Sequence, residues 1–268
     1  MFSTISSISS VITKGQNALV ITACPDPTSS DLLWFKFNPN NGIDLNTGTI
    51  RNFASNTTLT GCLVNSPILN TPAVGQNQDF GSVQIGTGSP YKYIICPLQI
   101  PMANPRTYAY TINCWLKIPS AAFTSSHNVC LFSFPTSYGQ YNNSFPYSIM
   151  KSGSNCYVSC LNNTQILYPS SKFYDNNWHM HTVSIGSGTD NNIKFYLDGV
   201  QLGTSPGSNI TFQNYNSTNG NCFGFLSWGG TGIWTIPSLT YADIRIYRSR
   251  IPDDQIRGLY RDTQTNHP

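Results

Sequence analysis

The sequence predicts an all-β protein with two packed antiparallel sheets and one short helix near the C-terminus. Short segments of alternating apolar and polar residues recur along the 268-residue chain. Gly, Pro, Asn and Ser separate these segments at spacings that suit a β-sandwich and not a series of βα units. A helix signal, Pro252-Asp253-Asp254, follows the last strand candidate. Only one helix is therefore expected.

The strand candidates share this alternation and these turn signals. Asp198-Gly199 joins two of them, because this pair tolerates the positive φ angles that a two-residue hairpin turn requires. Trp115 and Trp178 lie mid-strand and are expected in the core. The candidates are 50–54, 59–64, 81–86, 92–96, 108–118, 128–134, 146–151, 155–161, 178–186, 192–197, 200–204, 208–213, 221–227 and 239–248.

The helix is expected near 252–260. Its apolar residues Ile256, Leu259 and Tyr260 should pack against the sandwich, because so short a helix is not stable alone in water.

Two segments, NNWHMHTVSIGSGTDNNIKFYLDGVQLGT (176–204) and LTYADIRIYRSRIPDDQIRGLY (239–260), resemble the end of a laminin-G-like domain. Such domains belong to the concanavalin-A-like lectin/glucanase superfamily. Two upstream segments, DLLWFKFN (31–38) and YAYTINCWLKIP (108–119), resemble its first and central strands. The matching positions at the C-terminal end are Trp178, His179, Val183, Phe195, Tyr196, Asp198, Gly199, Asp243, Arg245, Ile246, Tyr247, Ile256, Leu259 and Tyr260.

The resemblance covers roughly 31–262 and implies a concanavalin-A-like jelly-roll sandwich. We therefore expect a single laminin-G-like domain over 31–268. Residues 1–30 precede this part. They are expected to form either an N-terminal arm that contacts another subunit or an extra strand of the chain's own sandwich.

The acidic residues favour a protein that is not an enzyme. All eleven are Asp, and the sequence contains no Glu. Glycosidases of this superfamily carry paired Glu residues on one strand, and glycoside hydrolysis generally needs two carboxyl groups flanking the scissile bond. The adjacent Asp253 and Asp254 are interpreted as capping and dipole residues of the helix. An Asp-based glycosidase is the least favoured alternative.

Two loops carry the residues expected to bind a ligand. Loop 135–147 contains Tyr138, Tyr141 and Asn142, and loop 227–235 places Trp228 and Trp234 around a Gly-rich turn. A sugar offers apolar C–H faces and hydroxyl edges, which suit aromatic rings beside amides. The alternative is that these aromatic residues cover the ends of the sandwich or lie in a subunit contact.

No metal or cofactor is expected. His179 and His181 lie on one strand face but lack an evident third ligand, and a packed or hydrogen-bonded role is favoured. Asp175-Asn176-Asn177 and Asp190-Asn191-Asn192 could supply oxygens to calcium, but both are typical turn sequences.

Charge and cysteine content limit the partners further. Five arginines between 245 and 261 are interpreted as a solvated face paired with nearby Asp residues. No basic run with interleaved aromatics indicates nucleic acid, and no segment is apolar enough to span a membrane. The eight cysteines lack C-x-x-C pairs, and most are expected to be free thiols.

These features favour a non-enzymatic, lectin-like binding or structural module whose partners are protein neighbours, glycan or both. Low charge, absent Glu and abundant Asn and Ile suit a capsid or surface component of a large DNA virus, present in the virion or an intracellular assembly. The alternative is a secreted or cell-surface adhesion domain that binds glycans.

Overall fold

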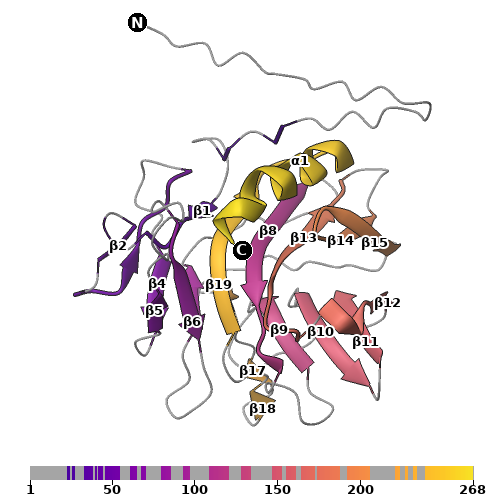
Figure 1. The fold of residues 1–268 in the computed structure, drawn as a ribbon, viewed down its shortest axis with the longest axis horizontal. Helices are drawn as coiled ribbons and strands as arrows, with labels where there is room; N and C mark the ends of the chain where they lie inside the picture. The colour runs from indigo at the N-terminus through magenta and orange to yellow at the C-terminus, as the bar shows by residue number, and fades with distance from the viewer. Residues whose placement is uncertain are drawn as a thin grey trace, which may run out of the picture.

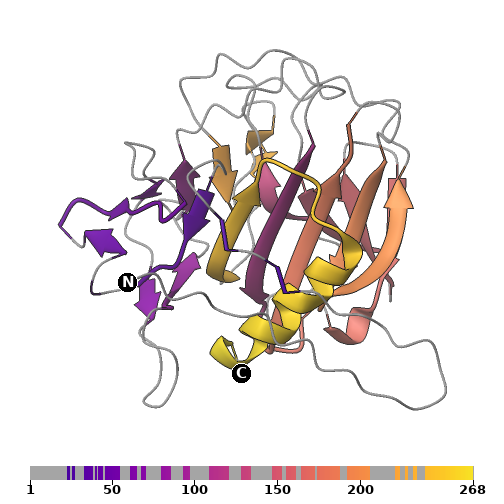
Figure 2. The same cartoon turned by 90° about the horizontal axis from the view of Figure 1, so that it is seen from above.

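Two antiparallel sheets lie face to face in the computed structural model, and the helix near the C-terminus covers the outer face of one of them (Figures 1 and 2). This arrangement confirms the predicted sandwich. The structure describes residues 23–24, 26–27, 33–38, 40, 42–44, 46–54, 61–64, 68–70, 80–85, 93–96, 109–120, 128–133, 147–152, 155–160, 164–172, 174–187, 192–205, 221–223, 227–228, 232–233 and 239–267.

The strands of both sheets run in spatial orders that mix near and distant parts of the chain. Within the described residues, the first sheet contains, in order, β15 (Val200–Ser205), β14 (Ile193–Leu197), β13 (Trp178–Ile185), β8 (Tyr110–Lys117), β19 (Leu239–Tyr247), β6 (Ser82–Ile85) and β5 (Ile68–Asn70), with β1 (Leu33–Phe35) also paired to β19. The second contains β12 (Thr164–Tyr168), β11 (Asn155–Cys160), β10 (Tyr147–Ser152), β9 (Asn128–Ser133), β16 (Asn221–Phe223), β7 (Tyr93–Cys96), β4 (Gly61–Val64), β3 (Thr49–Ile50) and β2 (Ile43–Asp44).

Shorter elements complete the described chain. They are the hairpin of β17 (Ser227–Trp228) and β18 (Gly232–Ile233), the helix α1 (Asp253–Thr263), and two 3-10 turns, η2 (Ser170–Lys172) and η4 (Gln264–Asn266). Strands β2, β5, β12, β17 and β18 were not predicted as separate strands. Candidate 208–213 lies outside the described residues.

The main core lies between the two sheets. On β8, Ile112, Cys114 and Leu116 point inward, and Val183 does so from the neighbouring β13. Because successive strand residues face opposite sides, the residues between them form the outer face of the first sheet. Thr111, Asn113 and Trp115 are nevertheless buried, so this outer face is covered as well.

Helix α1 provides much of that cover. Ile256 and Leu259 are buried against Trp115, and the ring of Tyr260 stacks on Trp115 with centroids 5.8 Å apart. These contacts confirm the predicted apolar face, and the helix ends three residues later than expected. Trp115 is 1% exposed, whereas Trp178 is only partly buried at the edge of this second core. The expectation for Trp178 is thus only partly met.

The predicted hairpin turn at Asp198-Gly199 is present. Both residues have positive φ, 51° and 76°, as a type I′ turn requires. The turn also lies against α1, since a Cβ added to Gly199 would sit 3.1 Å from the Cα of Arg257. Any side chain at position 199 would therefore strain the turn and press on the helix.

An extra residue interrupts β19. Ala242 pairs with Trp115 and Arg245 with Asn113, so β19 uses three steps where β8 uses two. Asp243 is the additional residue, and its φ of 45° identifies a β-bulge. The bulge turns a carboxylate into the covered outer face of the sheet, where Asp243 is completely buried.

The side chains of three of the eight cysteines are described, and for the other five the expectation of free thiols stays a prediction. Cys24, Cys114 and Cys156 form no disulfide. Burial raises the pKa of the Cys24 thiol to about 11, so this thiol is protonated at neutral pH.

Candidate functional site

The loops chosen from the sequence lie largely outside the described residues. Tyr138, Tyr141 and Asn142 fall between β9 and β10, and Trp234 follows β18; all four are outside the described part of the chain. Trp228 ends β17 and pairs with Gly232 through the backbone. The roles proposed for these residues remain predictions.

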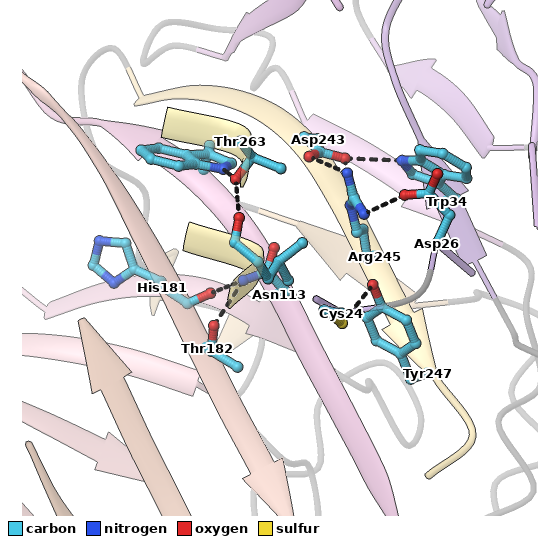
Figure 3. A network of polar contacts seen from close by, with 12 residues as sticks. Cys24, Asp26, Trp34, Asn113, His181, Thr182, Asp243, Arg245, Tyr247 and Thr263 are labelled. Atoms are coloured by element: carbon cyan, nitrogen blue, oxygen red, sulfur yellow. Dashed lines mark hydrogen bonds and ion pairs between the residues drawn. The ribbon is translucent and has the colours of Figure 1, made fainter. Parts of the chain in front are cut away.

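A different cluster emerges on the outer face of the first sheet, beside α1. Its centre is Trp34 on β1, whose indole N–H donates to Oδ1 of Asp243 at 2.8 Å. The guanidinium of Arg245 lies 4.7 Å from the centre of the same indole. The indole of Trp34 is therefore held by a hydrogen bond from its N–H and by a cation over its ring (Figure 3).

Arg245 links this indole to the N-terminal segment. Its Nε and Nη2 donate to the two carboxylate oxygens of Asp243, each at 2.8 Å, and its Nη1 donates to Asp26 at 2.9 Å. Although burial works against the charge, the Asp243 carboxylate raises the pKa of Arg245. The same segment places the Cys24 thiol 3.7 Å from the hydroxyl of Tyr247 (Figure 3).

For Arg245, this burial corrects the interpretation of the C-terminal arginines as a solvated face. Arg245 is 2% exposed, because the bulge at Asp243 supplies a buried counter-charge. Arg261 does follow the expectation, since it pairs with Asp262 in an exposed position. No sequence pattern indicates the bulge, and the buried pair therefore could not be expected.

Three aromatic rings surround a lysine next to Trp34. The ammonium of Lys36 lies 4.2 Å from the ring centre of Trp34, 5.0 Å from that of Phe53 and 5.4 Å from that of Phe80. Arg51 lies over Phe53 as well, at 4.8 Å. We call Lys36, Arg51, Phe53 and Phe80, with Trp34 beneath them, the outer-face cluster.

The outer-face cluster is built from three chain segments tied by hydrogen bonds. The backbone N–H of Phe53 donates to Trp34 O at 2.9 Å, and that of Gly81 donates to Lys36 O at 3.0 Å. The buried Asn52 side chain accepts from the backbone N–H groups of Trp34 and Ala54. The rings are therefore set on a fixed framework.

The outer-face cluster is open to solvent on one side. Trp34 is buried, whereas Lys36, Phe53 and Phe80 are half-buried and Arg51 is exposed. Within the described residues, neither Lys36 nor Arg51 has a carboxylate partner. Sequence reasoning missed these residues, although the alternation in Trp34-Phe35-Lys36 does place the first and third on one face.

A second polar cluster lies at the β14–β15 turn. The His179 ring contacts two carboxylates, Asp198 through Nδ1 at 2.9 Å and Asp175 through Nε2 at 3.1 Å, and Lys172 also pairs with Asp198. Burial opposes the charge, but the two carboxylates raise the pKa of His179 overall. Asp198 also accepts from the backbone N–H of Met180, so this cluster braces the turn. The hydrogen-bonded role expected for His179 is confirmed.

The described residues also bear on the predictions about metal sites, turn sequences and membrane spans. Within them, no group of three His, Cys, Asp or Glu side chains could hold a metal ion. Asp175 accepts from the backbone N–H of Asn177, as a turn residue does. The described helix is not long and apolar enough to cross a membrane.

The carboxylates at the start of α1 also differ from expectation. Pro252 is the N-cap, and no side chain caps the helix. Asp253 instead accepts from the hydroxyl of Tyr196 at 2.7 Å and pairs with Lys194 at 3.1 Å. The interpretation of Asp253-Asp254 as side-chain caps is therefore wrong, but both remain in the first turn, where the helix dipole favours negative charge.

The protein family that this chain matches has the same kind of architecture. A laminin-G family model, described as the concanavalin A-like lectin/glucanases superfamily, matches residues 96–257. That span is more than half of the 268 residues, and the chain belongs to this family. A comparison with curated proteins finds no match.

Solved structures similar to this chain include three binding domains of botulinum neurotoxins. They are the binding domain of neurotoxin DC in complex with SialylT (14% identity, TM-score 0.58), that of neurotoxin DC in complex with rat synaptotagmin II (14%, 0.55) and the receptor-binding domain of a C/D mosaic serotype (12%, 0.60). They match 87%, 88% and 89% of this chain but only 51%, 52% and 55% of their own. The chain thus spans about half their length, and the likeness concerns the fold.

Proposed function

We propose that this chain is a non-enzymatic binding module and that its ligand is a glycan. The outer-face cluster carries the proposal. Phe53 and Phe80 present partly exposed rings beside two cations, on a framework fixed by hydrogen bonds. Apolar ring faces beside polar donors are the pattern by which proteins hold sugars. The similar fold of a neurotoxin domain solved in complex with SialylT supports the same class of ligand.

The distribution of carboxylates argues against hydrolysis. The sequence has no Glu, and Asp243, Asp198 and Asp253 are each engaged by cations. A glycosidase needs one carboxyl that is free to donate a proton and another that is free to attack or activate water. We therefore propose no hydrolytic activity for this chain.

Glycan binding should depend on Phe53. In the Phe53→Ala variant, affinity for the best ligand found on a glycan array should fall roughly tenfold or more, because stacking on an aromatic ring contributes about 1–3 kcal/mol to ring binding. Isothermal titration calorimetry would measure this change. Tyr157→Ala is the matched control, because it removes a partly buried ring from the other sheet.

The same titration compares the predicted loops. Tyr141→Ala and Trp234→Ala test the sequence-based proposal that loops 135–147 and 227–235 bind the glycan. Loss of binding in these variants but not in Phe53→Ala would move the site to the loops. Unchanged affinity in all three would refute both positions.

A structural role in an assembly is the second candidate. The large apolar side chains exposed in the described residues lie on edge strands or turns: Leu167 on β12, Val200 on β15 and Ile68 on β5. Strands β12 and β15 contact each other, so Leu167 and Val200 lie at one edge of the sandwich. Exposed apolar edges favour association between chains. This observation supports the proposal of a capsid or virion component, with a cell-surface adhesion domain as the alternative location.

Self-association should be weakened by a charge at this edge. Leu167→Glu should shift the dimer or larger species of the full chain towards monomer in sedimentation velocity at micromolar concentration, because a buried carboxylate costs several kcal/mol. Gln165→Glu on the same strand is the charge control. If the wild-type chain is monomeric at all concentrations, the edge does not mediate self-assembly.

A further inference from the structure

The outer-face cluster combines positive charge with apolar rings. Lys36 and Arg51 lie over the same ring, Phe53, at 5.0 and 4.8 Å from its centre. Neither forms an ion pair within the described part of the chain. Four other described cations, Lys172, Lys194, Arg245 and Arg261, each contact an Asp. Among the described residues, these two cations thus share one aromatic surface that carries no carboxylate partner for them.

Lys36 is held where an anion can reach it. Three rings surround its ammonium, and Lys36 is only half-buried, so part of it faces solvent. The ring faces stabilise the cation through their quadrupoles but do not accept the hydrogen bonds that an ammonium group can donate. A carboxylate or sulfate oxygen would accept those hydrogen bonds.

We propose that the outer-face cluster binds an acidic saccharide. Its carboxylate or sulfate would pair with Lys36 and Arg51, and an apolar face of its ring would lie on Phe53 and Phe80. This inference rests on the proposed function and specifies the ligand class of that same site. Arg51 suits the anion particularly well, because a guanidinium can donate two parallel hydrogen bonds to a carboxylate.

The surroundings favour a saccharide over a polyanion. Nucleic acid binding generally uses a stripe of many cations that neutralises several phosphates. Here two cations stand beside partly exposed phenyl rings, and the net charge of the whole chain is only +3. One anionic group attached to a stackable ring matches this arrangement better than a continuous phosphate backbone.

Matched acidic and neutral sugars test the proposal. Sialyllactose, a glucuronic acid oligosaccharide and a sulfated lactose should bind the full chain, and lactose should bind at least tenfold more weakly. Lys36→Gln and Arg51→Gln should each weaken the acidic sugars roughly tenfold to a hundredfold, the range expected for one charge-assisted hydrogen bond. Lys36→Arg should restore part of the binding. Arg261→Gln, which removes an exposed charge on α1, is the control and should change nothing.

The outcomes separate this inference from the proposed function. Equal binding of acidic and neutral sugars, lost in Phe53→Ala but kept in Lys36→Gln, would overturn the inference and leave the glycan function intact. Absence of binding to every sugar would overturn both. Binding of single-stranded DNA or phosphatidylserine vesicles with the same dependence on Lys36 and Arg51, and no binding of the sugars, would replace the saccharide by another anion. A preference between the carboxylated and the sulfated sugars would identify the anionic group.

Discussion

Asp243→Asn should lower the free energy of unfolding by about 3–5 kcal/mol, the cost expected when one partner of a buried ion pair is removed. Asn keeps the side-chain shape and tolerates the positive φ of position 243, so the backbone penalty is small. The loss of charge, however, leaves Arg245 buried without its main counter-charge. Urea unfolding followed by tryptophan fluorescence would measure the change.

Asp26→Asn is the matched control, because Asp26 pairs with the same guanidinium. The Asp26 side chain is 67% exposed, and an exposed ion pair contributes at most about 1 kcal/mol. A loss in Asp26→Asn as large as that in Asp243→Asn would mean that the N-terminal segment, and not the bulge, stabilises Arg245. An unchanged midpoint in Asp243→Asn would contradict the buried pair.

The folded chain should lose several kcal/mol of stability between pH 7 and pH 4 through two buried histidines. Burial lowers the pKa of His181 to about 3 and that of His267 to about 4, from an ordinary value of 6.5. Their folded pKa values are depressed, so the unfolded chain takes up protons that the folded chain does not. Stability is thus complete above pH 6.5 and falls as the pH drops below it. By pH 4 each histidine should account for about 3 kcal/mol.

Variants that keep the rings but cannot titrate would isolate this effect. The His267 ring lies 4.8 Å from that of Trp115 and 5.5 Å from that of Trp178, and its buried Nε2 has no hydrogen-bond partner within the described residues. His267→Phe should therefore preserve the packing and flatten the pH dependence of unfolding. His181→Phe should also flatten the pH dependence and keep the stacking on Tyr168, but it removes the 3.4 Å contact between His181 Nε2 and the Tyr168 hydroxyl and should lower the stability at every pH. A slope unchanged in both variants would show that other groups cause the acid loss.

His179 should act in the opposite direction. Its folded pKa is raised, so its stabilising effect is complete below pH 6.5 and is lost as the pH rises above that value. Asp175 and Asp198, whose pKa values are lowered, contribute above about pH 4 and lose this contribution in acid. Taken alone, the cluster of His179, Asp175 and Asp198 therefore stabilises the fold most between about pH 4 and pH 6.5.

Much of the fold could be predicted because it follows from local alternation. In Tyr110–Lys117, Ile112, Cys114 and Leu116 alternate with polar residues or Trp, and this pattern alone assigns them to one face of a strand. In the same way, the spacing of the apolar residues in α1 predicts which face of the helix is buried. The short strands β2 and β5, two and three residues long, are too brief for any period to show.

The outer-face cluster could not be predicted for a different reason. Trp34 and Asp243 are 209 positions apart in sequence. Their contact depends on the pairing of β1 with the residues of β19 that follow the bulge. Nothing in Ala242-Asp243-Ile244 marks an additional residue, since the segment reads as an ordinary strand. The rings around Lys36 likewise come from three segments that only the sheet pairing brings together. Loops 135–147 and 227–235 are recognisable in the sequence because they are rich in aromatic residues, and their role in ligand binding stays a prediction.

The extra residue in β19 affects how related chains should be aligned. Before the bulge, Leu239 and Tyr241 face the inter-sheet core; after it, Ile244 and Ile246 do. In a relative without the additional residue, every second side chain along the whole strand would face the inter-sheet core without interruption. An alignment that puts its gap in a flanking loop would then equate inward-facing with outward-facing positions over half of β19. Placing the gap at position 243 keeps each side chain matched to its own face.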